Sequence, residues 1–263
     1  MKLFRLTALF VFLLAALSLS AQIAIYGDTR TNDDIHSKII TAISSHKPRI
    51  AFHSGDLGDK GIVQAEYDKF FEISLPLTRL CNIHPAKGNH ERDAALFLKN
   101  FPAIGEKTYY SVAYDGMLFL LLDSTIDLKP ESEQYKWLER ELAANTQIPA
   151  IIIIHHPVFS SGAHGDELGL ALFLPALFER HNVRAVFSGH DHNYERSEFG
   201  GIAYITTGGG GAPLRDAKHA NPHSIIFQKE HHYCIGERIE DMLFFEVYDL
   251  SGDVLDDFLI HLR

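Results

Sequence analysis

The chain has 263 residues, of which 46% are hydrophobic, so it is long enough to bury a core without a disulfide framework. Its formal net charge is −10, and an acidic surface repels nucleic-acid phosphates, so we expect no stable nucleic-acid binding. The two cysteines, Cys81 and Cys234, are expected either to pair or to be separate buried thiols.

Residues 1–21 have the features of a secretory signal peptide. Lys2 and Arg5 precede an apolar run over residues 6–17, which ends in the small residues 18–21. The run is shorter than the roughly 20 apolar residues that a membrane-spanning helix requires. An uncleaved N-terminal anchor is the alternative. We expect cleavage, export to the periplasm or the outside of the cell, no membrane span after cleavage, and one folded catalytic domain over residues 22–263.

Short apolar runs of strand length recur along the chain, and polar residues follow them. They cover residues 23–26, 50–53, 81–86, 117–122, 150–154 and 183–187. Amphipathic segments between them predict helices over residues 33–46, 64–72, 132–144 and 168–181. Pro175 should kink or restart the last of these helices. This alternation predicts an α/β fold in which sheets lie between helical layers.

The C-terminal part has a different pattern. Residues 201–207, 242–248 and 254–261 predict strands joined by tight turns, which would add antiparallel strands to a second sheet. Residues 208–223, which begin with a run of glycines, are expected to form a mobile loop near the site rather than a surface linker. His231 and His232 match no motif and are expected at the surface. A layered sandwich with two facing sheets follows from these patterns.

Histidine, aspartate and asparagine gather in segments that directly follow apolar runs. These segments are Gly27-Asp28-Thr29-Arg30, Gly55-Asp56-Leu57-Gly58-Asp59, Gly88-Asn89-His90-Glu91, His155-His156-Pro157 and Gly189-His190-Asp191-His192. Ligands of α/β sheets bind beyond the carboxyl ends of the strands, so these side chains should meet at one rim. Each segment alone is compatible with an ordinary turn or strand end. Together they predict a metal centre, because mixed Asp, Asn and His ligands suit Zn, Mn or Fe.

The geometry of these segments allows two ions rather than one. In His190-x-His192 an extended backbone would point both rings to the same side, so that each ion could receive one imidazole. The two oxygens of Asp56 could bridge ions that lie about 3.5–4 Å apart.

The order of the segments resembles the motif series of the calcineurin-like metallophosphoesterase superfamily, which is D-x-H, G-D, G-N-H-D/E, H and G-H-x-H. The resemblance covers almost all of residues 22–263. Residues 109–111 (YYS), 122–124 (LDS) and 188–197 (SGHDHNYERS) are similar to the purple acid phosphatase-like branch. The resemblance implies an α/β fold, a four-layer αββα sandwich with two mixed β-sheets, without the N-terminal β-domain of plant members.

The resemblance also implies an activity and a set of ligands. The protein would hydrolyse small phosphate monoesters through a metal-bound hydroxide, with two metal ions that could be Fe, Zn or Mn. Asp56 would bridge the ions. The remaining ligands would be Asp28 and His192 for the first ion, and Asn89, His155 and His190 for the second. His90 would contact the substrate and act as the acid, and His164 would contact the phosphate.

Two positions depart from the family pattern, both at the first ion. Arg30 replaces the histidine of D-x-H, and Asp59 occupies the position of the tyrosine of the purple branch, so no purple colour is expected. Asp59 could coordinate the ion or could cap a helix or turn. Arg30 stays protonated and cannot coordinate a metal. It could bind a phosphate oxygen or form a salt bridge with Asp28 or Asp59.

Two other functions fit the same motifs. One is a phosphodiesterase that acts on cyclic nucleotides or other small diesters. The other is a catalytically weak metal-binding scaffold. The nearly complete ligand set and the presence of His90 argue against the scaffold, whereas the shared motifs do not separate a phosphatase from a phosphodiesterase.

Overall fold

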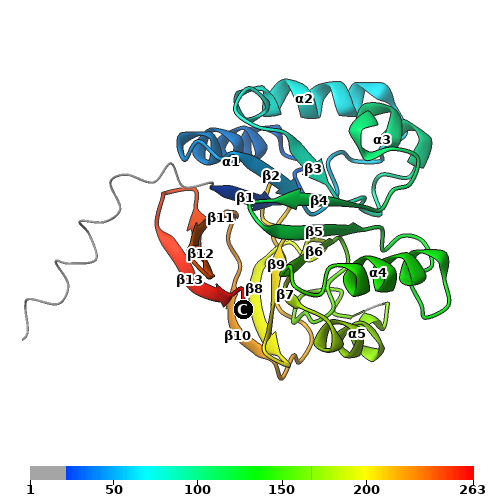
Figure 1. Cartoon of the computed structure of the whole chain (residues 1–263). Coiled ribbons are helices and arrows are strands. Elements are labelled where there is room, and N and C mark those ends of the chain that lie inside the picture. Colours follow the sequence, from blue (N-terminus) through cyan, green and yellow to red (C-terminus); the bar gives the residue numbers. More distant parts are fainter. Residues whose placement is uncertain (1–21, 167) are drawn as a thin grey trace, which may run out of the picture.

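The computed structural model describes residues 22–166 and 168–263, and the predicted signal peptide lies outside them. Over these residues, two mixed β-sheets face each other and helices cover both outer faces (Figure 1). This is the four-layer αββα arrangement that the family resemblance implied. Within this part of the chain, none of the helices has the length and apolar character that crossing a membrane requires.

The first sheet has the strand order β13-β12-β11-β1-β2-β3. Its strands are β1 (Ile23–Tyr26), β2 (Ile50–His53), β3 (Ile83–Pro85), β11 (His232–Ile239), β12 (Met242–Asp249) and β13 (Val254–His261). β1, β2 and β3 run parallel, whereas β11, β12 and β13 are antiparallel to their neighbours. The parallel part therefore places the loops after β1, β2 and β3 at one edge.

The second sheet has the strand order β10-β8-β9-β7-β6-β5-β4. Its strands are β4 (Tyr110–Tyr114), β5 (Met117–Leu122), β6 (Ala150–Ile154), β7 (Val183–Ser188), β8 (Tyr194–Phe199), β9 (Ile202–Thr207) and β10 (Ser224–Gln228). β5, β6, β7 and β9 are parallel. The tail strands are thus divided between the sheets, since β9 joins this sheet and β12 and β13 join the first.

Aromatic and branched side chains fill the space between the two sheets. Phe52 stacks on Phe119 with ring centroids 4.2 Å apart, and Phe187 lies 5.0 Å from Phe245. All four rings are fully buried. Burying a phenylalanine contributes roughly 2–3 kcal/mol, so these cross-sheet pairs hold the two sheets together. The apolar runs of β5 and β6 are continuous because helices cover their second face.

The helices follow the predicted amphipathic segments with local differences. They are α1 (Asp33–Ser45), α2 (Gln64–Thr78), α3 (Ala94–Asn100), α4 (Glu133–Ala144) and α5 (Leu174–Arg180). Helix α1 begins where Asn32 accepts a hydrogen bond from the Ile35 N–H, and its isoleucines face the sheet. Helix α2 is longer than predicted and includes Pro76. The predicted helix over residues 168–181 is instead a 3₁₀ turn followed by α5, which restarts with Pro175 in its first turn.

Two sequence expectations about single residues are decided by burial. Cys81 and Cys234 are separate buried thiols, and burial raises their pKa values to about 11 and about 12. His232 is fully buried, so the expectation that it lies at the surface was wrong. Its Nε2 lies 3.1 Å from the Thr207 hydroxyl and its Nδ1 donates to the Glu230 carbonyl. The Thr207 hydroxyl at the end of β9 and the Glu230 carbonyl just before β11 thus replace water as the partners of the two ring nitrogens.

Candidate metal centre

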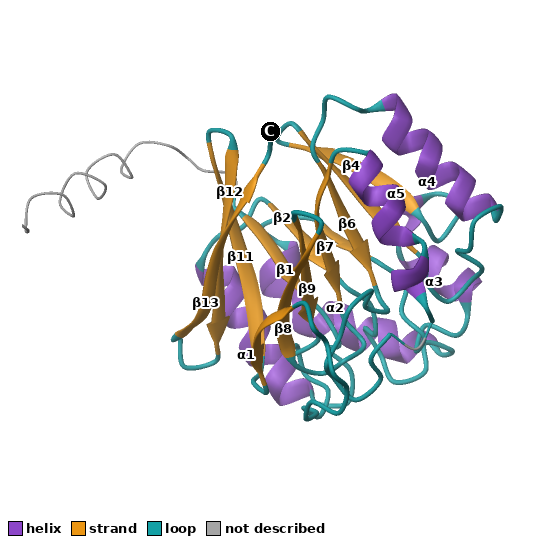
Figure 2. Ribbon diagram, turned by 90° about the horizontal axis from the view of Figure 1, so that it is seen from below, coloured by secondary structure: helices purple, strands orange, loops and turns teal. Residues whose placement is uncertain are grey.

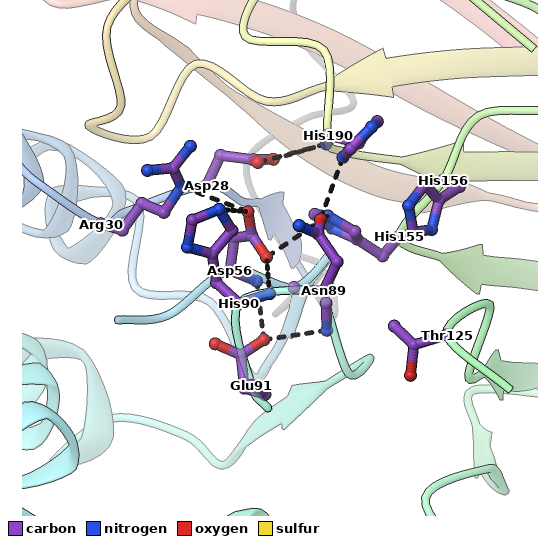
Figure 3. A network of polar contacts seen from close by, with 12 residues as sticks. Asp28, Arg30, Asp56, Asn89, His90, Glu91, Thr125, His155, His156 and His190 are labelled. Atoms are coloured by element: carbon purple, nitrogen blue, oxygen red, sulfur yellow. Dashed lines mark hydrogen bonds and ion pairs between the residues drawn. The ribbon is translucent and has the colours of Figure 1, made fainter. Parts of the chain in front are cut away.

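Loops crowd at one end of the two sheets, beyond the carboxyl ends of the parallel strands (Figure 2). Five of these loops carry the predicted ligands. Asp28 follows β1, Asp56 follows β2, Asn89 follows β3, His155 follows β6, and His190 follows β7. Figure 3 shows these side chains pointing toward one another.

The centre of the group is formed by three buried residues. Ligand atoms of Asp28, Asp56 and His155 all lie within 4.8 Å of one another. His155 Nε2 is 3.3 Å from Asp56 Oδ1, and His192 Nε2 is 3.5 Å from Asp28 Oδ1. Residues that are distant in sequence therefore meet as the strand-end pattern predicted.

Asn89 completes a second subset of donors. Its Oδ1 lies 2.8 Å from His155 Nε2 and 3.1 Å from His190 Nδ1. The amide oxygen and the two imidazoles thus converge on one point beside Asp56.

Several of these residues are held in a strained backbone conformation. Asp28, Asp56 and His190 have φ values of 57°, 61° and 67°, in the left-handed region that costs a non-glycine residue about 1 kcal/mol or more. Hydrogen bonds within the group maintain it, because the His190 N–H donates to Asp28 Oδ2 at 3.0 Å. Strain that is stabilised by functional side chains is typical of a binding or catalytic site.

Burial sets the charge state of the group. Burial and the nearby charge of Asp56 raise the pKa of Asp28 well above its usual range. Burial lowers the pKa of His155 and of His190 well below the usual value, and lowers the pKa of His192 to about 4. The imidazoles are therefore neutral, and neutral imidazole is the form that binds metals. Crowded carboxylates beside neutral imidazoles form a donor set that fits cations.

Backbone carbonyls fix the orientation of two of the rings. His155 Nδ1 lies 2.9 Å from the Ser54 carbonyl, and His192 Nδ1 lies 2.8 Å from the Pro213 carbonyl. A carbonyl can only accept, so each Nδ1 carries the proton and each Nε2 presents its lone pair to the carboxylates. This is the arrangement that orients histidine ligands in metalloproteins.

Glu91 has a supporting role that the sequence did not assign, although it belongs to the Gly-Asn-His-Glu segment. Its buried carboxylate accepts hydrogen bonds from the N–H groups of Gly88 (2.8 Å), Asp56 (2.9 Å) and Leu57 (2.9 Å). Burial and the charge of Asp56 raise its pKa to about 8. Glu91 thereby joins the loop after β3 to the loop after β2.

Arg30, His90 and Asp59 lie on one side of Asp56. Arg30 Nε donates to Asp56 Oδ2 at 3.2 Å, so its salt-bridge partner is Asp56 rather than Asp28 or Asp59. His90 Nε2 lies 3.8 Å from the same oxygen, and His90 Nδ1 donates to the backbone carbonyl of Asp59. The Asp59 side chain is exposed.

His164 approaches the group from a different loop. Its ring lies 4.3 Å from the ring of His190 and contacts the Arg215 guanidinium. The Arg215 N–H in turn donates to the His192 carbonyl at 3.0 Å. The loop over residues 208–223 therefore lies at the site as expected, and it contributes Arg215, which sequence reasoning missed.

The family model described as calcineurin-like phosphoesterase matches residues 21–194. Purple acid phosphatase 18 of Arabidopsis thaliana is 29% identical over 66% of this chain and 47% of its own length. Probable inactive purple acid phosphatase 27 of the same plant is 27% identical over 68% of this chain and 37% of its own length. A nucleotide pyrophosphatase/phosphodiesterase of Hordeum vulgare is 25% identical over 81% of this chain and 72% of its own length. The chain thus spans less than half the length of the two Arabidopsis relatives.

A solved structure shares the fold. A purple acid phosphatase from yellow lupin (Lupinus luteus) seeds superposes with a TM-score of 0.79 and 20% identity, over 93% of this chain and 54% of that chain. Fold, motif order and sequence relatives agree: the chain belongs to the calcineurin-like phosphoesterase family, in its purple acid phosphatase-like branch.

Proposed function

We propose that this protein is an exported, metal-dependent phosphatase that hydrolyses phosphate monoesters at a two-metal centre. The observation that carries the proposal is the meeting of Asp28, Asp56 and His155 within 4.8 Å, at the end of three different strands. When bound, two cations supply a water activated as a nucleophile near neutral pH and neutralise charge on the phosphoryl oxygens.

The proposed ligand assignment is the one that the family resemblance implies, and the distances between the donor atoms support it. Asp56 would serve both ions, since its carboxylate lies at the centre of the group. Asp28 Oδ1 and His192 Nε2 are 3.5 Å apart, and these two residues would hold the first ion. Asn89 contacts both His155 and His190, and these three residues would hold the second.

Asp59 is a further candidate ligand of the first ion, because it follows Asp56 by three residues in the position of the family tyrosine. Elemental analysis of Asp59→Ala tests this assignment. Loss of one ion supports it. Retention of both ions removes it and leaves Asp59 with the backbone contact to His90.

The residues around the cluster have proposed roles in binding and proton transfer. His90 protonates the leaving alcohol, and its ring is held by the Asp59 carbonyl beside Asp56. Arg30 and His164 hold the phosphate from two sides, and a planar guanidinium suits phosphate oxygens. Replacing His90 by alanine should slow esters with poor leaving groups more than those with good ones. Equal slowing of both would remove His90 as the acid.

Export is part of the proposal and is supported by the charged, apolar and small-residue pattern of residues 1–21. Mass spectrometry of the mature protein in the extracellular or periplasmic fraction tests it. A start at residue 21 or 22 is the expected result, and a mature protein that keeps residues 1–20 in the membrane fraction would contradict it.

The central experiment combines activity with metal content. Wild-type protein should hydrolyse 4-nitrophenyl phosphate, and Asp56→Ala or Asn89→Ala should abolish turnover and reduce bound metal. Asp257→Asn, an exposed change on β13, is the matched control. Faster hydrolysis of bis(4-nitrophenyl) phosphate would favour the phosphodiesterase alternative. Bound metal without turnover of either ester would favour a binding scaffold.

A further inference from the structure

A groove with a volume of about 560 Å³ lies between α1 and α2, beside the loops that follow β1 and β2. The two helices run side by side over the first sheet (Figure 1). Leu57, Phe70 and His36 form its buried floor and are each at most 4% exposed, whereas most of the side chains on its walls are polar. The volume lies within the range of roughly 300–1,000 Å³ that small-molecule pockets occupy.

The groove opens next to the metal centre. Arg30 and Asp59 line it, and Arg30 also donates to Asp56 Oδ2. His90 Nε2 faces the same Asp56 oxygen at 3.8 Å, whereas His155 faces the other oxygen, Oδ1. Figure 3 shows Arg30 and His90 on one side of Asp56 and His155 on the other. His90 therefore lies on the groove side of the centre, where its Nδ1 contacts Asp59.

We propose that this groove binds the alcohol half of the substrate, and that the substrate is a phosphate monoester of an uncharged or cationic, nucleoside-sized alcohol. This inference rests on the proposed function. In the hydrolysis, the water oxygen bonds to phosphorus, the phosphorus–ester oxygen bond breaks, and the alcohol oxygen takes a proton from His90 Nε2. Water supplies the hydroxyl of the phosphate and replaces the proton lost from His90. The alcohol must therefore leave on the side of His90, which is the side of the groove.

The charges of the groove select the kind of alcohol. Asp33, Asp34 and Glu66 lie on its wall, and the ammonium of Lys69 is already paired with Glu72 at 3.1 Å. The guanidinium of Arg30 donates to Asp56 through Nε and, in the proposed function, holds the phosphate that is hydrolysed, so it is not available to a second phosphate. A second phosphate would be repelled by these carboxylates, whereas hydroxyl and amino groups can donate to them. Burial lowers the pKa of His36 to about 3, so the floor adds no positive charge.

Adenosine monophosphate and ribose 5-phosphate form a matched pair for the test, because both release a primary 5′-alcohol and only the former carries a base. Wild-type protein should prefer the nucleotide by at least about tenfold in kcat/KM. Ala65 is exposed at the start of α2 and lines the groove, so Ala65→Trp should bring this ratio close to one. Ala143→Trp, an exposed change on α4, is the control and should keep the wild-type ratio.

Binding of adenosine alone, measured by calorimetry, is independent of catalysis. Wild-type and Ala143→Trp proteins should bind it, and Ala65→Trp should weaken binding by at least about tenfold. If wild type binds adenosine more tightly than Ala65→Trp but hydrolyses neither ester, the groove is supported as the adenosine site and the proposed phosphatase activity is overturned. Equal hydrolysis of both esters without adenosine binding would overturn the groove and leave the phosphatase. No hydrolysis and no binding would overturn both.

A second variant tests the charge argument and replaces Ala65→Trp if that protein does not fold. Asp34→Lys adds a cation to the wall of the groove. It should improve kcat/KM for adenosine 3′,5′-bisphosphate relative to the monophosphate by several fold. An unchanged ratio would contradict the location of the alcohol in this groove.

Discussion

The carboxylate of Asp191 accepts a hydrogen bond from the backbone N–H of His164 at 3.0 Å, between loops that lie 27 residues apart in sequence. Asp191 stands between His190 and His192 and is fully buried. It also accepts from the Ser160 hydroxyl at 2.6 Å and from the Gly165 N–H at 3.3 Å. The segment that presents two metal-ligand candidates therefore also positions the loop that carries His164.

Asp191→Asn should weaken phosphate binding. The amide replaces one acceptor oxygen with a donor that faces other donors, so the loop shifts and His164 loses its position. We expect kcat/KM for 4-nitrophenyl phosphate to fall by about tenfold, mainly through KM, with a parallel rise in the inhibition constant for inorganic phosphate. Asp257→Asn is the control. A fall confined to kcat, with phosphate inhibition unchanged, would argue against this positioning role.

Gly88→Ala should disrupt the metal centre. A Cβ at Gly88 would lie 2.3 Å from Asp56 Oδ1 and 2.5 Å from the Asp56 backbone nitrogen, which is far inside van der Waals contact. We expect loss of bound metal and a drop in activity of at least about a hundredfold.

Gly201→Ala separates this effect from general instability. Gly201 has a φ of 74° and open space around it, so alanine there should cost about 1 kcal/mol of folding stability and leave metal content and activity intact. Equal metal content in Gly88→Ala and Gly201→Ala would show that the metal centre does not require the close approach of Gly88 to Asp56.

The meeting of the candidate ligands at one rim could be predicted because each follows an apolar run. Pairing of β1 with β2 brings the loops of Asp28 and Asp56 to one edge of the first sheet, and His155 joins them from β6 of the second sheet because the two sheets face each other. The supporting residues could not be found in this way. Asp191, Glu91 and Arg215 act through hydrogen bonds between loops. Which loops contact each other is decided by the tertiary fold, so the residues near each position in the sequence do not predict these bonds.

The parts of the fold that the sequence did not predict also depend on contacts between residues that are distant in sequence. β4 alternates between partly buried and exposed positions at a sheet edge, and its strand conformation comes from pairing with β5. His232 was expected at the surface because it matches no motif. Its burial depends on the Thr207 hydroxyl of β9, a partner 25 residues away.

The buried His232 should make folding stability sensitive to acid. Burial lowers its pKa from 6.5 to about 4, so between these values the unfolded chain binds a proton that the folded protein does not. Stability is therefore present above pH 6.5 and is lost as the pH falls toward 4. Between pH 7 and pH 5, His232→Gln should lose about 2 kcal/mol less free energy of unfolding than wild type.

Urea unfolding followed by circular dichroism, at equal metal loading, measures this difference. His261→Gln, an exposed histidine on β13, is the control and should keep the wild-type dependence. An equal loss of stability in His232→Gln and wild type would show that His232 is not the acid-sensitive group.

The metal content of the purified protein tests the account most directly. Elemental analysis by mass spectrometry should find about two ions of iron, zinc or manganese per chain, and Asp56→Ala should lose them together with hydrolysis of 4-nitrophenyl phosphate. A wild-type protein that hydrolyses the ester while binding no such ion, or an Asp56→Ala protein that keeps both metal and activity, would contradict the account.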